Sequence, residues 1–235
     1  MANTLVYLLD GKIYINLTNK CTNDCIFCLR KDKDDVVGQT LWLDNENSTA
    51  HDVIEQFENL LSEGKKARRQ EGKLLSEKET LNDDLPSCPP ALMSSEVIFC
   101  GYGEPMLKFD VLKDVAKYIK DKYPDTKIRV NTNGHANFVY KRNVVPELKG
   151  LVDEFSVSLN GATKEEYNEL SQPVFDEAYE EVKKFIKACA DENISVVASV
   201  VEGYKGRHLD LETCEHIAND LGAKFRVREW IQNGY

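Results

Sequence analysis

Short apolar segments alternate with longer amphipathic ones along most of this chain. Six segments of five to seven residues are predicted strands: 12–17, 96–100, 127–131, 154–159, 194–200 and 224–228. Four segments with apolar residues at every third or fourth position are predicted helices: 50–61, 109–122, 175–189 and 209–221. This order predicts an α/β fold of βα units around a parallel sheet. Right-handed crossovers would close the six units into a barrel or a partial (β/α)6 barrel.

The first predicted strand follows another apolar run, residues 5–8. Asp10 and Gly11 join the two, and this dipeptide favours the left-handed backbone of a two-residue hairpin turn. We therefore expect a short β-hairpin at the N-terminus, before the first βα unit.

The predicted strands are apolar on one face and polar on the other. Ile128 and Val130, for example, alternate with Arg129 and Asn131. Because helices cover the apolar face, the polar side chains are expected to point into the barrel and to line a ligand cavity. A sheet with one solvent-facing side is the alternative. The polar positions supply four candidate substrate-binding residues: Asn16, Arg129, Arg226 and Arg228.

Composition and charge narrow the class of protein. Apolar residues make up 42% of the 235 residues and charged residues 30%, which is typical of one globular domain, residues 1–235. No apolar run approaches the roughly eighteen residues of a membrane span. The formal charge of −10 argues against a general affinity for nucleic acid or anionic membranes. The first residues lack the features of a signal peptide, so we expect a cytoplasmic protein whose seven cysteines are reduced.

Residues 62–95 interrupt the alternation of strands and helices. They are rich in Lys, Arg, Glu, Ser and Pro, whereas a few residues normally suffice between a helix and the next strand. We expect an insertion that is helical at its start and partly flexible. It is either a solvated loop or a docking element for a partner or an anionic substrate.

Three cysteines, Cys21, Cys25 and Cys28, follow the first strand of the predicted barrel with three and two residues between them. Thiolates this close on one loop can converge on one metal centre, and soft sulfur ligands select zinc or an iron–sulfur cluster. A structural zinc site usually needs four ligands. The other four cysteines are dispersed: Cys88, Cys100, Cys189 and Cys214. Three ligands on a four-iron cluster would leave one iron open to a group that is not protein.

Three further motifs stand at the ends of the next three predicted strands. They are Gly101-Tyr102-Gly103-Glu104-Pro105, Asn131-Thr132-Asn133-Gly134 and Ser158-Leu159-Asn160-Gly161. The cysteine loop also carries an aromatic residue, Phe27, before its last cysteine. This combination resembles the radical S-adenosylmethionine (SAM) superfamily. With residues 225–228 included, it is most similar to the TatD-linked radical SAM proteins, whose substrate is not established.

The resemblance implies a radical SAM enzyme with two cofactors, a 4Fe-4S cluster and SAM. Cys21, Cys25 and Cys28 would hold three irons, and the fourth iron would bind the amino and carboxylate groups of SAM. Reductive cleavage of SAM to a 5′-deoxyadenosyl radical would start hydrogen abstraction from an unidentified small-molecule or peptide substrate. The resemblance places these residues against SAM: Phe27, Gly103, Glu104, Asn131, Thr132, Ser158 and Asn160. Tyr102 departs from the pattern, because many relatives have a glycine there.

The resemblance also implies partners. These are an electron donor such as a flavodoxin or ferredoxin and a functional link to a TatD-type hydrolase. Two other classes remain open. One is a glycyl-radical-type activating enzyme or peptide-modifying enzyme that acts on a protein partner, with 62–95 as docking arm. The other is a non-catalytic iron–sulfur electron-transfer module, which would usually have four cysteine ligands and no SAM motifs.

For several chemically reactive residues, the sequence leaves two interpretations open. Cys100 is either a hydrogen-atom donor or a free cysteine packed as a small hydrophobe. Arg226 and Arg228 suit a substrate carboxylate or phosphate, or an internal ion pair with Asp or Glu. Of the histidines, His135 alone follows a motif loop that reaches the expected site. The dispersed cysteines other than Cys100 are interpreted as structural: Cys88, Cys189 and Cys214.

Overall fold

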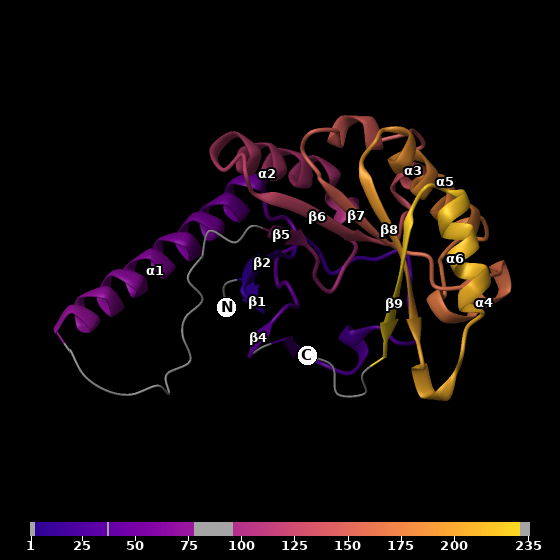
Figure 1. The fold of residues 1–235 in the computed structure, drawn as a ribbon, viewed down its shortest axis with the longest axis horizontal. Coiled ribbons are helices and arrows are strands. Elements are labelled where there is room, and N and C mark those ends of the chain that lie inside the picture. Colours follow the sequence, from indigo (N-terminus) through magenta and orange to yellow (C-terminus); the bar gives the residue numbers. More distant parts are fainter. Residues whose placement is uncertain (1–2, 37, 78–95, 231–235) are drawn as a thin grey trace.

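A seven-stranded sheet forms the centre of the molecule (Figure 1). The computed structural model describes residues 3–36, 38–77 and 96–230, and for residues 64–77 the backbone alone. Across the sheet the strands are β1 (Val6–Leu9), β2 (Lys12–Ile15), β5 (Glu96–Phe99), β6 (Lys127–Thr132), β7 (Glu154–Ser158), β8 (Ser195–Glu202) and β9 (Lys224–Glu229). β1 is antiparallel to β2, and every other neighbouring pair is parallel. The predicted α/β fold is confirmed, and the sheet is consistent with a partial barrel.

The N-terminal hairpin turns at the predicted dipeptide. Asp10 and Gly11 have φ angles of 49° and 71°, which are the left-handed values of a two-residue type I′ turn. The register pairs Leu9 with Lys12 directly across the turn. The hairpin therefore places β1 at one edge of the sheet and leaves β2 beside β5.

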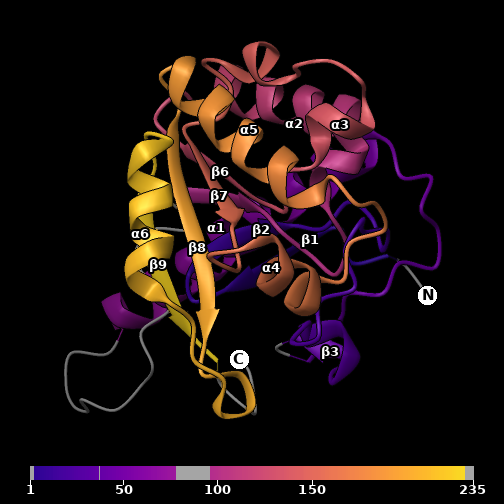
Figure 2. The ribbon, with the colours of Figure 1, turned by 90° about the vertical axis from the view of Figure 1, so that its right-hand side faces the viewer.

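Helices α2, α5 and α6 cover one side of the sheet (Figures 1 and 2). The described helices are α1 (Ala50–Glu77), α2 (Phe109–Lys122), α3 (Ala136–Val139), α4 (Lys164–Ser171), α5 (Ala178–Asp191) and α6 (Leu211–Asp220). Two short strands, β3 (Asp35–Val36) and β4 (Gln39–Thr40), form a separate ribbon. Four 3-10 turns complete the described elements: η1 (Leu29–Lys31), η2 (Pro105–Lys108), η3 (Val145–Leu148) and η4 (Tyr204–Gly206).

Three helices differ from the sequence prediction. The four-residue helix α3 is too short to show a helical period and is not among the predicted helices. α1 continues to Glu77, past its expected end at residue 61, so the first part of the segment 62–95 is helical. Residues 78–95, with Cys88, lie outside the described residues. α4 is a helix that periodicity missed, because it has only eight residues. Its start carries a capping signal: the Thr163 hydroxyl accepts from the amide of Glu166 at 3.2 Å, and the Glu166 carboxylate accepts from that of Ala162 at 2.8 Å.

The hydrophobic core lies between the sheet and its covering helices. Each predicted apolar position from β2 to β7 is buried there: Ile13, Ile15, Leu17, Ile128, Val130, Phe155, Val157 and Leu159. α2 and α5 contribute the opposite side of the core: Leu112, Val115, Ile119, Val182, Phe185 and Ile186. Full burial of each such side chain stabilises the fold by about 1.5–3 kcal/mol. In the edge strand β9 the coverage is poorer, and Val227 is 39% exposed.

The other face of the sheet is polar, as the alternation predicts. Asn16, Ser156 and Ser199 are buried there, and Arg129 and Arg226 are partly buried. The three motif loops and the cysteine loop all follow strands at the same edge, because parallel strands end together. Among the described residues, no helix combines the length and the apolar character that a membrane span requires.

Candidate functional site

Cys21, Cys25 and Cys28 lie in the loop that follows β2 and ends at η1. All three are free and partly buried. Burial raises the pKa of Cys21 to about 11 and that of Cys25 to about 12. The negative charge of Glu104 adds to the increase for Cys21, and the charges of the Cys21 and Cys28 thiolates add to it for Cys25. These thiols therefore stay protonated at neutral pH unless a positive centre compensates the charge of the thiolates.

The sulfur of Cys21 already accepts hydrogen bonds from its surroundings. The backbone amide of Asn23 lies 3.4 Å from this sulfur, and Nδ2 of Asn133 lies 3.6 Å from it. Donors of this kind stabilise a thiolate and tune the potential of a metal centre that it binds. No three His, Cys, Asp or Glu side chains in the described part of the chain are grouped to hold a single metal ion.

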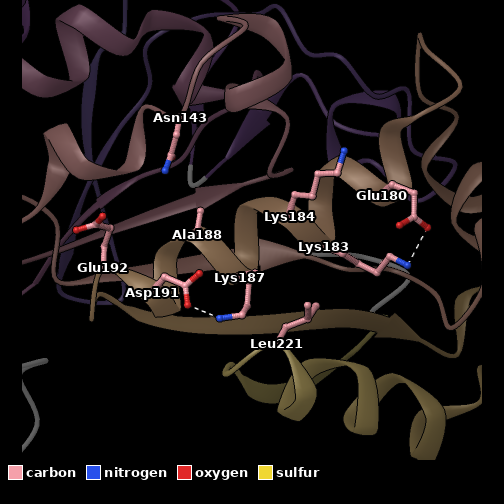
Figure 3. Close-up of a pocket in the computed structure, with 9 residues that line it drawn as sticks. All are labelled: Asn143, Glu180, Lys183, Lys184, Lys187, Ala188, Asp191, Glu192 and Leu221. Carbon is pink, nitrogen blue, oxygen red and sulfur yellow. Dashed lines mark hydrogen bonds and ion pairs between the residues drawn. The ribbon is translucent and has the colours of Figure 1, made fainter.

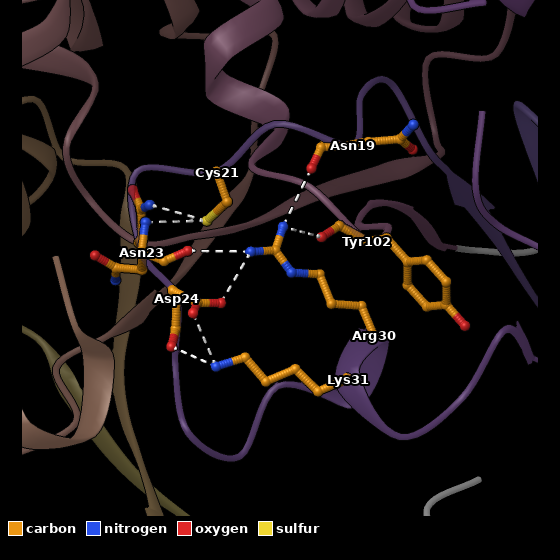
Figure 4. A network of polar contacts seen from close by, with 8 residues as sticks. Asn19, Cys21, Asn23, Asp24, Arg30, Lys31 and Tyr102 are labelled. Atoms are coloured by element: carbon orange, nitrogen blue, oxygen red, sulfur yellow. Dashed lines mark hydrogen bonds and ion pairs between the residues drawn. The ribbon is translucent and has the colours of Figure 1, made fainter. Parts of the chain in front are cut away.

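Arg30 ties the cysteine loop together from inside (Figure 4). One guanidinium nitrogen, Nη1, donates to the carbonyl oxygens of Asn19 at 3.1 Å and of Tyr102 at 3.5 Å. The other, Nη2, donates at 3.4 Å to the carbonyl oxygen of Asn23 and to Oδ1 of Asp24. The Arg30 side chain is 16% exposed. Arg30 thus connects the cysteine loop to the second motif through one partly buried cation, which the sequence analysis did not single out.

A second network holds the outer side of the loop. The hydroxyl of Thr22 lies 2.8 Å from Nδ1 of His135, and Nε2 of His135 lies 2.9 Å from the hydroxyl of Tyr167. That hydroxyl in turn accepts from Nδ2 of Asn23 at 3.2 Å. Burial lowers the pKa of His135 to about 4, so the ring is neutral at physiological pH. His135 therefore supports the cysteine loop. It follows the third motif and connects Thr22 of the loop to Tyr167 of α4.

The glycines of the second motif allow close contact within the chain. A Cβ on Gly103 would lie 2.2 Å from the carbonyl oxygen of Thr18 and 2.6 Å from that of Lys20. A Cβ on Gly101 would lie 2.0 Å from Oδ1 of Asn16. Only a residue without a Cβ fits at these positions. The amide of Glu104 also donates to the carbonyl of Lys20 at 2.8 Å, so the second motif and the cysteine loop form one unit.

Glu104 is a buried carboxylate with three hydrogen-bond donors. Its Oε1 accepts from the hydroxyl of Thr132 at 2.7 Å and the amide of Met106 at 3.0 Å, and its Oε2 accepts from the amide of Asn133 at 2.7 Å. Burial nevertheless raises the pKa of Glu104 to about 7. A cationic group placed against it would restore the charged form.

The other predicted cofactor contacts lie at the same ends of the strands. Asn160 follows β7 with a left-handed φ of 56°, and its Nδ2 donates to Ser171 at 3.1 Å. Phe27 meets Tyr204 edge to face, with ring centroids 6.0 Å apart. Ser158 ends β7 and pairs in register with Ser199. Asn160 keeps a buried Oδ1 with no hydrogen-bond partner among the described residues.

The candidate substrate-binding residues differ in the partners that they have within the chain. Asn16 is used by the chain itself, since its Nδ2 donates to the carbonyl of Leu41 at 2.7 Å. Arg129 forms an ion pair with Glu96 at 3.4 Å, which is the alternative that the sequence left open for the other arginines. Arg226 instead donates to the hydroxyl of Ser156 at 2.6 Å.

A surface hollow of about 470 Å³ lies elsewhere, on the outer side of α5 (Figure 3). Its lysines are matched by acids, such as Lys183 with Glu180 at 2.8 Å and Lys187 with Asp191. None of the residues in the cysteine loop or the motif loops lines it. This hollow is a solvated helix face and not part of the site.

Comparison with known protein families identifies the site. The family model of the radical SAM superfamily matches residues 91–221, more than half of the chain. The chain belongs to the radical SAM superfamily. The match includes the three later motifs and begins after the cysteine loop, so the loop adds independent support from the sequence. A search of the curated proteins gave no match.

Solved structures similar to this radical SAM chain include SuiB from Streptococcus suis. SuiB itself aligns with a TM-score of 0.55 at 13% identity, over 93% of this chain and 39% of that chain. SuiB bound to the precursor peptide SuiA gives 0.57 at 13%, over 97% and 41%. SuiB bound to SAM gives 0.55 at 12%, over 93% and 40%. At this identity the likeness shows the fold alone, and the chain spans about two fifths of the length of these neighbours.

Membership of the superfamily brings two cofactors, a 4Fe-4S cluster and SAM. The residues of this chain fit both. Three thiols on one loop suit iron and sulfide, and two N–H groups are directed at the sulfur of Cys21. The cradle of Glu104, with its raised pKa, suits the amino group of SAM, and the orphaned oxygen of Asn160 offers an unused acceptor at the next strand end.

Proposed function

We propose that this protein is a radical SAM enzyme that cleaves SAM reductively and abstracts hydrogen from a substrate. The observation that carries the proposal is the junction of Gly103 and Glu104 with the backbone of Thr18 and Lys20, which brings the Glu104 cradle beside Cys21. When bound, the cluster would transfer one electron to SAM, which splits into methionine and a 5′-deoxyadenosyl radical. The chain itself binds, orients and shields the two cofactors.

The roles of the individual residues follow from their chemistry. Cys21, Cys25 and Cys28 would ligate three irons. Glu104 would accept a hydrogen bond from the SAM amino group, while Thr132 and Asn133 hold its carboxylate in place. The remaining proposed SAM contacts are Phe27, Gly103, Asn131, Ser158 and Asn160.

A reconstitution experiment tests this function. The protein is loaded anaerobically with iron and sulfide, and SAM and a strong reductant are added; 5′-deoxyadenosine and methionine are expected in equal amounts. Glu104→Gln is the informative variant, because an amide nitrogen would face the amide of Asn133, so SAM binding should weaken by roughly tenfold or more. A full four-iron cluster that binds SAM but yields no 5′-deoxyadenosine would contradict the proposal.

A second candidate is a peptide-modifying enzyme. It is supported by the structural likeness to SuiB, which has been solved with a precursor peptide bound. An activating enzyme for another protein belongs to the same class. A non-catalytic electron-transfer module is less consistent with the buried Glu104 cradle, which such a module does not need. Stimulation of 5′-deoxyadenosine formation by a protease-sensitive factor from cell extract would support the peptide substrate, and a protease-resistant factor would contradict it.

The finer assignments belong to this proposal as well. The order of motifs supports a TatD-linked radical SAM protein, with a functional link to a TatD-type hydrolase and a flavodoxin or ferredoxin as electron donor. The chain would be one domain with an insertion at 62–95. It would act in the cytoplasm, where its free cysteines stay reduced.

A further inference from the structure

Three arginines belong to the polar face of the sheet: Arg129 and Arg226 are partly buried, and Arg228 is exposed. Arg129 follows Ile128 in β6, and Arg226 and Arg228 lie in β9. Arg226 reaches across β8 to the hydroxyl of Ser156 in β7. The charges of Arg228 and Arg129 both act on the thiol of Cys100. Asn131 pairs in register with Ser156, and Cys100 follows Phe99, which pairs with Val130, so Cys100, Asn131 and Ser156 form a row across the ends of β5, β6 and β7. Arg226 contacts one end of this row.

This row holds hydrogen-bonding atoms that the chain does not use. Nε of Arg129, Nε of Arg226 and Oδ1 of Asn131 are buried and have no hydrogen-bond partner among the described residues. A buried polar atom without a partner is costly and rare in native proteins. The two arginine nitrogens are donors, so they indicate a ligand that accepts hydrogen bonds, whereas the oxygen of Asn131 is an acceptor and fits its proposed contact with SAM.

The surroundings of Arg129 and Arg226 carry a positive charge. Glu96 is the one described carboxylate that forms an ion pair with Arg129, and it also pairs with Lys12 at 2.7 Å. Arg226 has a neutral partner, Ser156, and forms no ion pair within the described ranges. A buried guanidinium is stable when an anion compensates it. The net charge of −10 gives no hint of this local surplus.

The row lies next to the proposed SAM site. Cys100 immediately precedes the second motif, and Asn131 immediately precedes Thr132, which holds Glu104. We propose that Arg129, Arg226 and Arg228 form a subsite that binds an anionic group, a carboxylate or a phosphate, of the substrate. The proposal rests on the proposed function, because it assigns a substrate class to the same barrel. The planar guanidinium matches either anion through two parallel hydrogen bonds.

Binding of simple anions to the holoenzyme tests the subsite. The cluster-loaded protein, saturated with SAM, is titrated calorimetrically with inorganic phosphate, glutarate and N-acetylglutamate amide. Phosphate and glutarate represent a free phosphate or carboxylate, and the capped amino acid represents an acidic side chain of a peptide. The wild type is expected to bind at least one probe, and Arg226→Gln should raise its Kd roughly ten- to a hundredfold through loss of charge-assisted bonds.

Two further variants make the result specific. Arg226→Lys keeps the positive charge but cannot form two parallel hydrogen bonds, so a Kd between those of the wild type and Arg226→Gln is expected. This variant replaces Arg226→Gln in the test if Arg226→Gln does not fold. Lys183→Gln removes a cation from the outer face of α5 and should bind the probe as the wild type does. The subsite is wrong if the wild type binds no probe or if both Arg226 variants bind as the wild type does. It is also wrong if the probe binds only to the SAM-free protein, since the arginines would then hold SAM itself. Formation of 5′-deoxyadenosine by the wild type is a separate readout, so failure of the subsite leaves the proposed function standing.

Discussion

Gly103 packs against the backbone of Thr18 with no room for a side chain. A Cβ on Gly103 would lie 2.2 Å from the carbonyl oxygen of Thr18. Thr18 lies at the start of the cysteine loop, and Gly103 directly precedes Glu104. The contact therefore sets the distance between the proposed cluster ligands and the proposed SAM cradle.

Gly103→Ala is expected to separate the two loops. Backbone atoms surround the new methyl group and cannot move aside as a side chain could, so stability should fall by about 1–3 kcal/mol and iron loading and SAM binding should be impaired. Urea unfolding and iron analysis measure both effects. Gly150→Ala is the control. Because Gly150 has a φ of 80°, this variant should lose about 1–2 kcal/mol of stability. A Cβ at this position meets nothing within 4 Å, so iron loading should not change.

Replacement of a single loop cysteine should abolish the four-iron cluster. Cys25→Ala removes a proposed ligand, and at this partly buried position water cannot replace a thiolate with equal affinity for iron. Iron content and the visible absorption of the reconstituted protein measure the loss. Cys100→Ala, outside the loop, should keep the full iron content. A Cys25→Ala protein with a complete cluster would refute the ligand assignment.

Arg30→Gln should loosen the cysteine loop and lower the reduction potential of the cluster. It leaves the carbonyls of Asn19 and Asn23 without their donor and removes a positive charge beside Cys21, whose pKa that charge lowers. Iron content and a redox titration followed by electron paramagnetic resonance measure the two effects.

Two companion variants separate the charge of Arg30 from its geometry. Arg30→Lys keeps the charge, so its potential should stay near that of the wild type while iron loading falls. Lys31→Gln removes a more exposed cation that pairs with Asp24 at 3.0 Å, and it should change both quantities little. Wild-type loading and potential in Arg30→Gln would contradict the role of Arg30.

His135 should make the metal-free protein sensitive to acid. Its pKa of about 4 lies below the value of 6.5 expected in the unfolded chain, so its contribution is complete above pH 6.5 and is lost as the pH falls towards 4. The difference corresponds to about 3 kcal/mol. Glu104 acts in the opposite direction, since its raised pKa favours the fold at low pH and that contribution is lost as the pH rises through about 7.

Comparison of variants isolates the histidine, because the contribution of Glu104 cancels. His135→Gln should flatten the dependence of the unfolding free energy on pH between 6.5 and 4. Thr22→Val keeps the imidazole and removes one of its hydrogen bonds, so it should lower stability by about 1–3 kcal/mol with the slope retained. Urea unfolding at a series of pH values measures both. An unchanged slope in His135→Gln would show that another group titrates.

Much of the fold and part of the site could be predicted from local patterns. The period of two in the strands, the period of about 3.6 in α2 and the dipeptide Asp10-Gly11 each act over a few residues, and the structure has these elements at the predicted places. The position of the motifs at one edge of the sheet could also be predicted, because the carboxyl ends of parallel strands lie at the same edge. α4 could have been found from Thr163 and Glu166, a capping pair that periodicity alone overlooks in a short helix.

By itself, the sequence determined the order of the βα units, the polar inner face and the family, since these follow from periodicity and from motifs within single loops. Only the tertiary structure decided which side chains meet. Thr22 and His135 are 113 positions apart, and Asn23 and Tyr167 are 144 apart. Distant segments are also joined by the contacts of Arg30, by the close contact of Gly103 with Thr18 and by the hydrogen bond from Arg226 to Ser156. Such contacts leave no local pattern, because they depend on how the strands twist and where their ends come together in space.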